Sequence, residues 1–196
     1  GSIFIGSRAG IPIDTNASHD KNTTSEPCTE PCMKIIDPEF AFYGPIGYDL
    51  GNIIANLYCS LMYAAFSRKK LSAADDFIER IAAAIEALPQ LFTAKALERC
   101  KTVPLSDPLY NERYIRWRLA EILADAYGFA GTEIIRRAAG DTKTAEFDAM
   151  GQDTRRITME RIIIKTACRL IKQRRQANIG ALTVAYFKKT LLHSGI

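Results

Sequence analysis

Apolar positions recur with the spacing of α-helices along most of the chain after Gly47. Residues 48–66 form an almost continuous apolar run, which predicts a buried helix. Between Phe77 and Leu88 apolar residues return every three or four positions, which predicts an amphipathic helix with Ser72 as its N-cap. Further segments that we expect to be helical are 89–100, 109–127, 132–139, 153–175 and 178–193.

Proline and glycine mark the expected boundaries between these helices. Pro89 is expected to begin a new segment, because proline lacks the N–H that a helix interior requires. Gly128 and Gly131 indicate a turn, after which Thr132 can cap a short helix. Residues 101–108 contain two prolines and read as a linker. We therefore expect helix breaks at Pro89 and at the two glycines.

The first part of the chain lacks this helical spacing. Residues 2–5 are β-branched and aromatic and predict a strand, and residues 33–36 predict its hairpin partner. Residues 6–32 are rich in Asn, Ser, Thr, Asp and Pro, so we expect a disordered surface loop. The expected fold class is mainly α, with a β-hairpin followed by a helical bundle in one domain spanning 1–196.

The composition of the chain disfavours a membrane-spanning protein and a nucleic-acid-binding protein. The chain has 196 residues, 47% of them hydrophobic, which is enough for one core. The mean hydropathy is −0.07, and the longest apolar run, residues 53–66, is shorter than the roughly 20 residues of a spanning helix. The net charge of +4 comes from scattered basic pairs rather than one stripe, which disfavours nucleic-acid binding. We expect neither a membrane nor a nucleic acid as partner.

The five cysteines indicate a reducing compartment. Cys59, Cys100 and Cys168 fall in predicted helices and are expected to be buried. Cys28 and Cys32 lie in the polar loop, where two thiolates without a second pair are a weak zinc signal. The alternative is a pair of free thiols, which fits a cytoplasmic protein.

Two carboxylates, Asp37 and Glu39, flank Pro38 at the end of the second predicted strand. Closely spaced carboxylates on a rigid turn suit Mg²⁺, which prefers oxygen ligands and keeps places for phosphate and water. The alternative is a simple turn in which Asp37 accepts local N–H groups.

The next segment, Gly44-Pro45-Ile46-Gly47-Tyr48-Asp49, leads into the first predicted helix. Gly44, Pro45 and Gly47 favour a tight turn, and Asp49 can cap the helix that follows. We therefore assign Gly44, Gly47 and Asp49 structural roles.

A pair of arginines, Arg136 and Arg137, follows an apolar stretch of predicted helix. Consecutive helix residues point about 100° apart, so both guanidinium groups cannot share one outer face. Arginine suits phosphates and vicinal hydroxyls because its donors form a planar fork. The pair therefore either binds a ligand or is neutralised in part by an acid such as Glu133 or Asp49.

These segments together resemble the 5-methylthioribose kinases, a branch of the aminoglycoside-phosphotransferase and choline-kinase-like superfamily. Residues 37–57 resemble the segment in which this family replaces the Asp-Phe-Gly of protein kinases by Asp-x-Glu. Residues 128–140 resemble its motif Gly-Phe-x-Gly-x-x-x-Ile-Arg-Arg-x-x-Gly. Residues 159–174 fit its last long helix, and residues 1–3 fit the tail of its catalytic loop, His-Gly-Asp-Leu-His-Thr-Gly-Ser-Ile.

The resemblance implies the C-terminal lobe of a protein-kinase-like fold and the ATP-dependent phosphorylation of 5-methylthioribose in methionine salvage. Asp37 and Glu39 would then hold Mg²⁺, with Ser2 as a candidate further ligand. Arg136 and Arg137 would contact methylthioribose and stabilise charge on the transferred phosphoryl group. The co-substrate would be ATP, and the complete protein would be a homodimer.

The sequence departs from the family in several places. The catalytic aspartate would lie four residues before Gly1 and the ATP-binding lobe further upstream, so we expect this chain to be inactive by itself. The family usually continues Gly-x-Ala-His after the arginines, whereas residues 140–143 lack the histidine. The alternatives are an aminoglycoside-, homoserine- or choline-type phosphotransferase, or a degenerate helical fragment without activity. Choline is the least favoured substrate, because paired arginines repel a cation.

Overall fold

The computed structural model describes residues 2–7, 31–36, 43–67, 75–102, 111–140, 147 and 154–193. The chain divides into two compact units, residues 1–44 and residues 45–196. Each unit is described by itself, and the single domain expected from the sequence stays a prediction.

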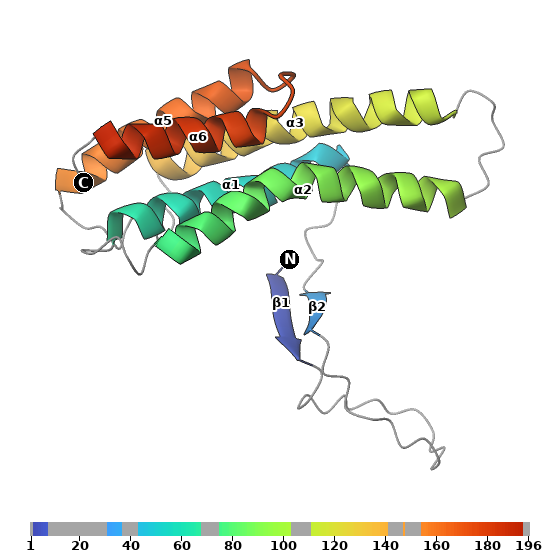
Figure 1. Cartoon of the computed structure of the whole chain (residues 1–196), viewed down its shortest axis with the longest axis horizontal. Helices are drawn as coiled ribbons and strands as arrows, with labels where there is room; N and C mark the ends of the chain where they lie inside the picture. Colours follow the sequence, from blue (N-terminus) through green and yellow to red (C-terminus); the bar gives the residue numbers. More distant parts are fainter. Residues whose placement is uncertain are drawn as a thin grey trace, which may run out of the picture. The chain divides into compact units, whose positions relative to one another are not determined.

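The first unit contains an antiparallel β-hairpin (Figure 1). Strand β1 (Ser2–Ser7) pairs with β2 (Pro31–Ile36), and Ser2 lies opposite Ile36. Each strand is two residues longer than the sequence predicted, at the expense of the connecting loop. The expected disorder of that loop concerns residues 8–30, which lie outside the described residues.

The second unit is built from helices that pack side by side (Figure 1). Their bounds are α1 (Ile46–Ser67), α2 (Asp75–Thr102), α3 (Glu112–Ala139), α5 (Thr154–Lys172) and α6 (Ile179–His193). The helices expected at 48–66, 153–175 and 178–193 are confirmed within a few residues. Within the described part of the chain, no helix has the length and apolar character needed to cross a membrane.

The expected helix break at Pro89 is wrong, because α2 continues through this residue. Proline removes one hydrogen bond, to the carbonyl four residues earlier, and leaves the rest of the ladder intact. Ile85 is fully buried and Phe92 packs against the core, so tertiary contacts hold the helix on both sides of the proline.

The expected turn at Gly128 and Gly131 is also wrong, because both lie in the interior of α3. A Cβ atom at Gly131 would lie 2.7 Å from the carbonyl oxygen of Ala167 and 2.5 Å from Cγ1 of Ile171. Gly131 therefore permits the close approach of α3 and α5, and its role is in packing rather than in a turn.

Small residues also bring α1 and α3 together. A Cβ atom at Gly51 would lie 2.7 Å from the carbonyl oxygen of Ala126, and one at Gly47 would lie 2.9 Å from that of Ile122. Since later residues of α1 meet later residues of α3, the two helices run in the same direction (Figure 1). This parallel pair is the frame on which the candidate site is built.

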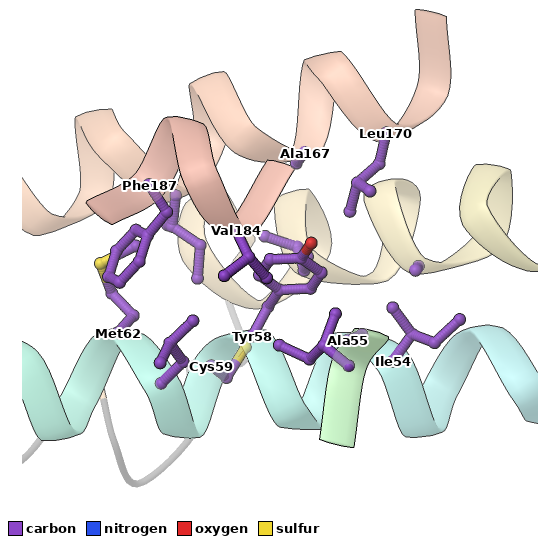
Figure 2. Close-up of a cluster of buried hydrophobic side chains, with 14 of the residues drawn as sticks. Ile54, Ala55, Tyr58, Cys59, Met62, Ala167, Leu170, Val184 and Phe187 are labelled. Carbon is purple, nitrogen blue, oxygen red and sulfur yellow. The ribbon is translucent and has the colours of Figure 1, made fainter. Parts of the chain in front are cut away.

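The core lies between α1 and the helices that cover it. Figure 2 shows Tyr58 and Met62 of α1 pointing toward Val184 and Phe187 of α6. All four side chains are almost completely buried. Among the cysteines assigned to helices, Cys59 is buried as expected, whereas the other two, Cys100 and Cys168, are half-buried.

Candidate functional site

The two arginines singled out from the sequence lie in the last turn of α3 and share one carboxylate. Nε of Arg136 donates to Oε2 of Glu133 at 2.7 Å, and its Nη2 donates to Oε1 at 2.7 Å. Nε of Arg137 donates to the same Oε1 at 2.6 Å. Of the two acids considered as partners, Glu133 and Asp49, it is Glu133 that pairs with both arginines.

Burial divides this cluster into an inner and an outer part. The side chains of Glu133 and Arg137 are 15% and 14% exposed, whereas that of Arg136 is 58% exposed. The hydrogen bonds from Arg136 lower the pKa of Glu133, against an opposing effect of burial, and those from Arg137 add to this. In return, Glu133 raises the pKa of Arg136. The cluster therefore holds one carboxylate and two guanidinium cations.

Asn56 ties the inner arginine to α1. Nη1 of Arg137 donates to Oδ1 of Asn56 at 2.6 Å. The Nδ2 atom of Asn56 donates in turn to the carbonyl oxygen of Asn52 at 2.8 Å, which orients the amide. Asn56 entered the sequence argument as part of the family-like segment and of the apolar run 53–66, without a role of its own. No signal in the sequence distinguishes it, because Asn56 is exposed and α1 carries other polar residues, among them Asn52.

The start of α1 lies beside the middle of α3, before the turn that carries the arginines. The rings of Tyr48 and Phe129 meet edge to face, with centroids 5.5 Å apart. Asp49 lies in the first turn of α1 and is exposed, a position where a carboxylate is favoured by the helix dipole. Gly47 is buried within α1 against α3, whereas Gly44 precedes the helix and is exposed.

The structure does not show where the expected metal ligands lie relative to the arginine cluster. Asp37 and Glu39 lie outside the described residues, and Ser2 belongs to β1 in the other unit. Among the side chains that are described, no three His, Cys, Asp or Glu residues form a group suited to a metal ion. The magnesium assignment therefore stays a prediction.

The cluster can bind an anion or an oxygen-rich ligand. One carboxylate against two guanidinium groups leaves a net positive charge, and the exposed Arg136 presents it to solvent. Guanidinium donors match phosphate oxygens and vicinal hydroxyls in geometry. Such an arrangement suits the binding of a sugar and the stabilisation of a phosphoryl group.

A separate cavity of about 850 Å³ lies between α2, α3 and the connection from α5 to α6. Arg175 and Glu121 form an ion pair on its wall, with Nη2 of Arg175 2.7 Å from Oε2 of Glu121. None of the candidate ligand-binding or metal-binding residues predicted from the sequence lines it. The cavity is distinct from the arginine cluster.

Comparison with known proteins relates the chain to one enzyme family. No family model matches it. It is 30% identical to methylthioribose kinase of Bacillus pumilus (strain SAFR-032) over 178 residues, 91% of this chain and 43% of that protein. It is 34% identical to methylthioribose kinase of Geobacillus thermodenitrificans (strain NG80-2) over 157 residues, 79% of this chain and 37% of that protein. The chain thus spans less than half the length of these curated relatives. The resemblance drawn from the sequence is confirmed, and the chain is related to the methylthioribose kinases.

Proposed function

We propose that this chain is the C-terminal lobe of a methylthioribose kinase. As part of a longer protein it would transfer the γ-phosphate of ATP to the 1-hydroxyl of 5-methylthioribose, a step of methionine salvage. The observation that carries the proposal is the arginine cluster at the end of α3, in a chain related to proteins named methylthioribose kinase.

Arg136 and Arg137 are the residues that we assign to substrate. Their hydrogen-bond donors suit the sugar hydroxyls, and their charge offsets the negative charge of the transferred phosphoryl group. The net positive charge left after pairing with Glu133 supports this role. Arg136 is the more accessible of the two and is the better target for a test.

Asp37 and Glu39 are proposed to hold Mg²⁺, with Ser2 as a candidate third ligand. The donor set fits, because carboxylate and hydroxyl oxygens are the ligands that a hard cation prefers. Magnesium held there would supply positive charge that neutralises part of the charge of the ATP phosphates. Gly44, Gly47 and Asp49 would shape the start of α1.

The remaining parts of the proposal concern the complete protein. We expect it to be cytoplasmic and homodimeric, and we expect the present chain to be inactive without the catalytic aspartate and the ATP-binding lobe. Two exposed apolar side chains, Leu91 in the middle of α2 and Trp117 near the start of α3, favour association with another surface. Sedimentation of the complete protein would give its oligomeric state.

Substitution of Arg136 in the complete kinase tests the function. We expect Arg136→Ala to lower kcat/KM for methylthioribose about 100- to 1,000-fold, the loss that follows removal of one preorganised donor. Arg80→Ala is the matched control, because Arg80 also pairs with an acid one helical turn away but lies on α2. An unchanged kcat/KM in the Arg136 variant would reject the proposal.

A further inference from the structure

The two guanidinium groups converge on one point although the backbone directs them apart. Side chains of consecutive helix residues leave the axis about 100° apart, and two cations repel each other. Arg136 and Arg137 nevertheless donate to the same atom, Oε1 of Glu133, at 2.7 and 2.6 Å. The shared carboxylate is therefore what brings the two cations together.

A second residue fixes Arg137 from the neighbouring helix. Its Nε atom is held by Glu133 and its Nη1 atom by Asn56 of α1, so the plane of the guanidinium is set at two points. A free arginine side chain loses roughly 1.5–2 kcal/mol of rotamer entropy when it is ordered. Here the folded chain itself supplies two hydrogen bonds that restrict the side chain of Arg137.

The exposures of these side chains explain why the ion pairs are strong while the cluster keeps a net positive charge. Glu133 and Arg137 are mostly buried, which strengthens their attraction, whereas most of Arg136 remains exposed. One carboxylate cannot neutralise two guanidinium groups. The cluster thus combines fixed geometry with an excess of one positive charge.

We propose that Glu133 and Asn56 are positioning residues that hold Arg136 and Arg137 in the arrangement that binds the phosphoryl group. The inference rests on the proposed function, since it assumes that the arginines act on the transferred phosphate. In this proposal both residues act through their contacts with the arginines and not on the reacting atoms. Both keep the guanidinium donors oriented before the reaction, so that the donors need not reorganise in the transition state. Preorganised groups lower an activation barrier in this way.

Steady-state kinetics of the complete kinase provide the first test. Glu133→Gln and Asn56→Ala are expected to lower kcat/KM about 10- to 100-fold, mostly through kcat, because misplaced donors fail chiefly in the transition state. Glu112→Gln is the matched control, since Glu112 also pairs with an arginine one turn along α3. We expect this control to stay within about twofold of wild type. Circular dichroism at the assay temperature verifies that every variant is folded.

A measurement without substrate separates the inference from the function on which it rests. The exchange of the Arg137 Nε–H proton, followed by ¹⁵N NMR, is expected to be slow in the wild type and at least about tenfold faster in Glu133→Gln. If Arg136→Ala lowers activity but Glu133→Gln does not, the positioning role is overturned and the function stands. If the wild type does not phosphorylate methylthioribose, the function fails, and unchanged exchange in Glu133→Gln would overturn the positioning role as well.

Discussion

Glycines three residues apart in one helix have different functions in this protein. Gly128 and Gly131 both lie inside α3. A Cβ atom at Gly131 would meet the backbone oxygen of Ala167 at 2.7 Å, whereas one at Gly128 would meet only Cδ of Arg174, at 3.4 Å. The first contact involves backbone that cannot move away easily, and the second involves a flexible side chain.

Alanine substitutions at these two glycines should therefore change stability in opposite directions. Gly131→Ala is expected to lower the free energy of unfolding by about 1–3 kcal/mol through overpacking against α5. Gly128→Ala is expected to raise it by up to about 1 kcal/mol, because alanine favours the helix more than glycine does. Urea denaturation of both variants measures the difference. Equal changes in the two variants would contradict this account of α3.

At the scale of elements, tertiary contacts outweigh local signals. Helix α2 runs for 28 residues through Pro89, and α3 runs for 28 residues through both of its glycines. Pro89 leaves the carbonyl of Ile85 without its helical donor, and a Cβ atom at Gly180 of α6 would lie 3.4 Å from that oxygen. The missing hydrogen bond in α2 therefore lies next to the first turn of α6.

Replacing Pro89 by a residue with a backbone N–H should stabilise α2, because the carbonyl oxygen of Ile85 can then accept a hydrogen bond. We expect Pro89→Ala to raise the free energy of unfolding by about 1–3 kcal/mol, because it restores one hydrogen bond and removes the steric cost of the ring. Gln90→Ala, an exposed neighbour, is the control and should change stability by less than about 0.5 kcal/mol. A loss of stability in Pro89→Ala would mean that packing against α6 depends on the proline.

At the scale of the whole helical unit, two tyrosines join three helices. Tyr58 of α1 donates its hydroxyl hydrogen to the carbonyl oxygen of Gly180 at 3.3 Å. The hydroxyl oxygen of Tyr127 of α3 accepts a hydrogen bond from the backbone of the same residue, which lowers its pKa against the larger effect of burial. Burial raises the pKa of Tyr127 to about 12, and it raises the pKa of Tyr58 further. Burial therefore favours the neutral form of both phenols in the folded chain.

Stability should consequently fall at alkaline pH. The folded chain keeps the proton of Tyr127 at a pH where the unfolded chain, with a phenol pKa near 10, loses it. The contribution is complete below about pH 10 and is lost as the pH rises toward 12. Urea midpoints between pH 8 and pH 11 should decline for the wild type and decline less for Tyr127→Phe. Identical slopes for the two proteins would contradict the assignment.

The sequence by itself determined the helical class, most helix positions and the family. Apolar spacing is a local pattern, and a motif such as residues 128–140 can be read without knowing the fold. The sequence also marked Arg136 and Arg137 as candidate ligand-binding residues, because two consecutive arginines follow an apolar stretch of helix.

Only the tertiary structure decided how those residues are used. Whether Gly131 marks a turn or a helix crossing depends on Ala167, 36 positions away in the printed sequence. The pairing of Glu133 with Arg136 and Arg137 is local, since the residues lie three and four positions apart in α3. The contact of Arg137 with Asn56, by contrast, depends on how α3 lies against α1. Distances between segments remote in sequence are set by packing, and local propensity carries no information about them.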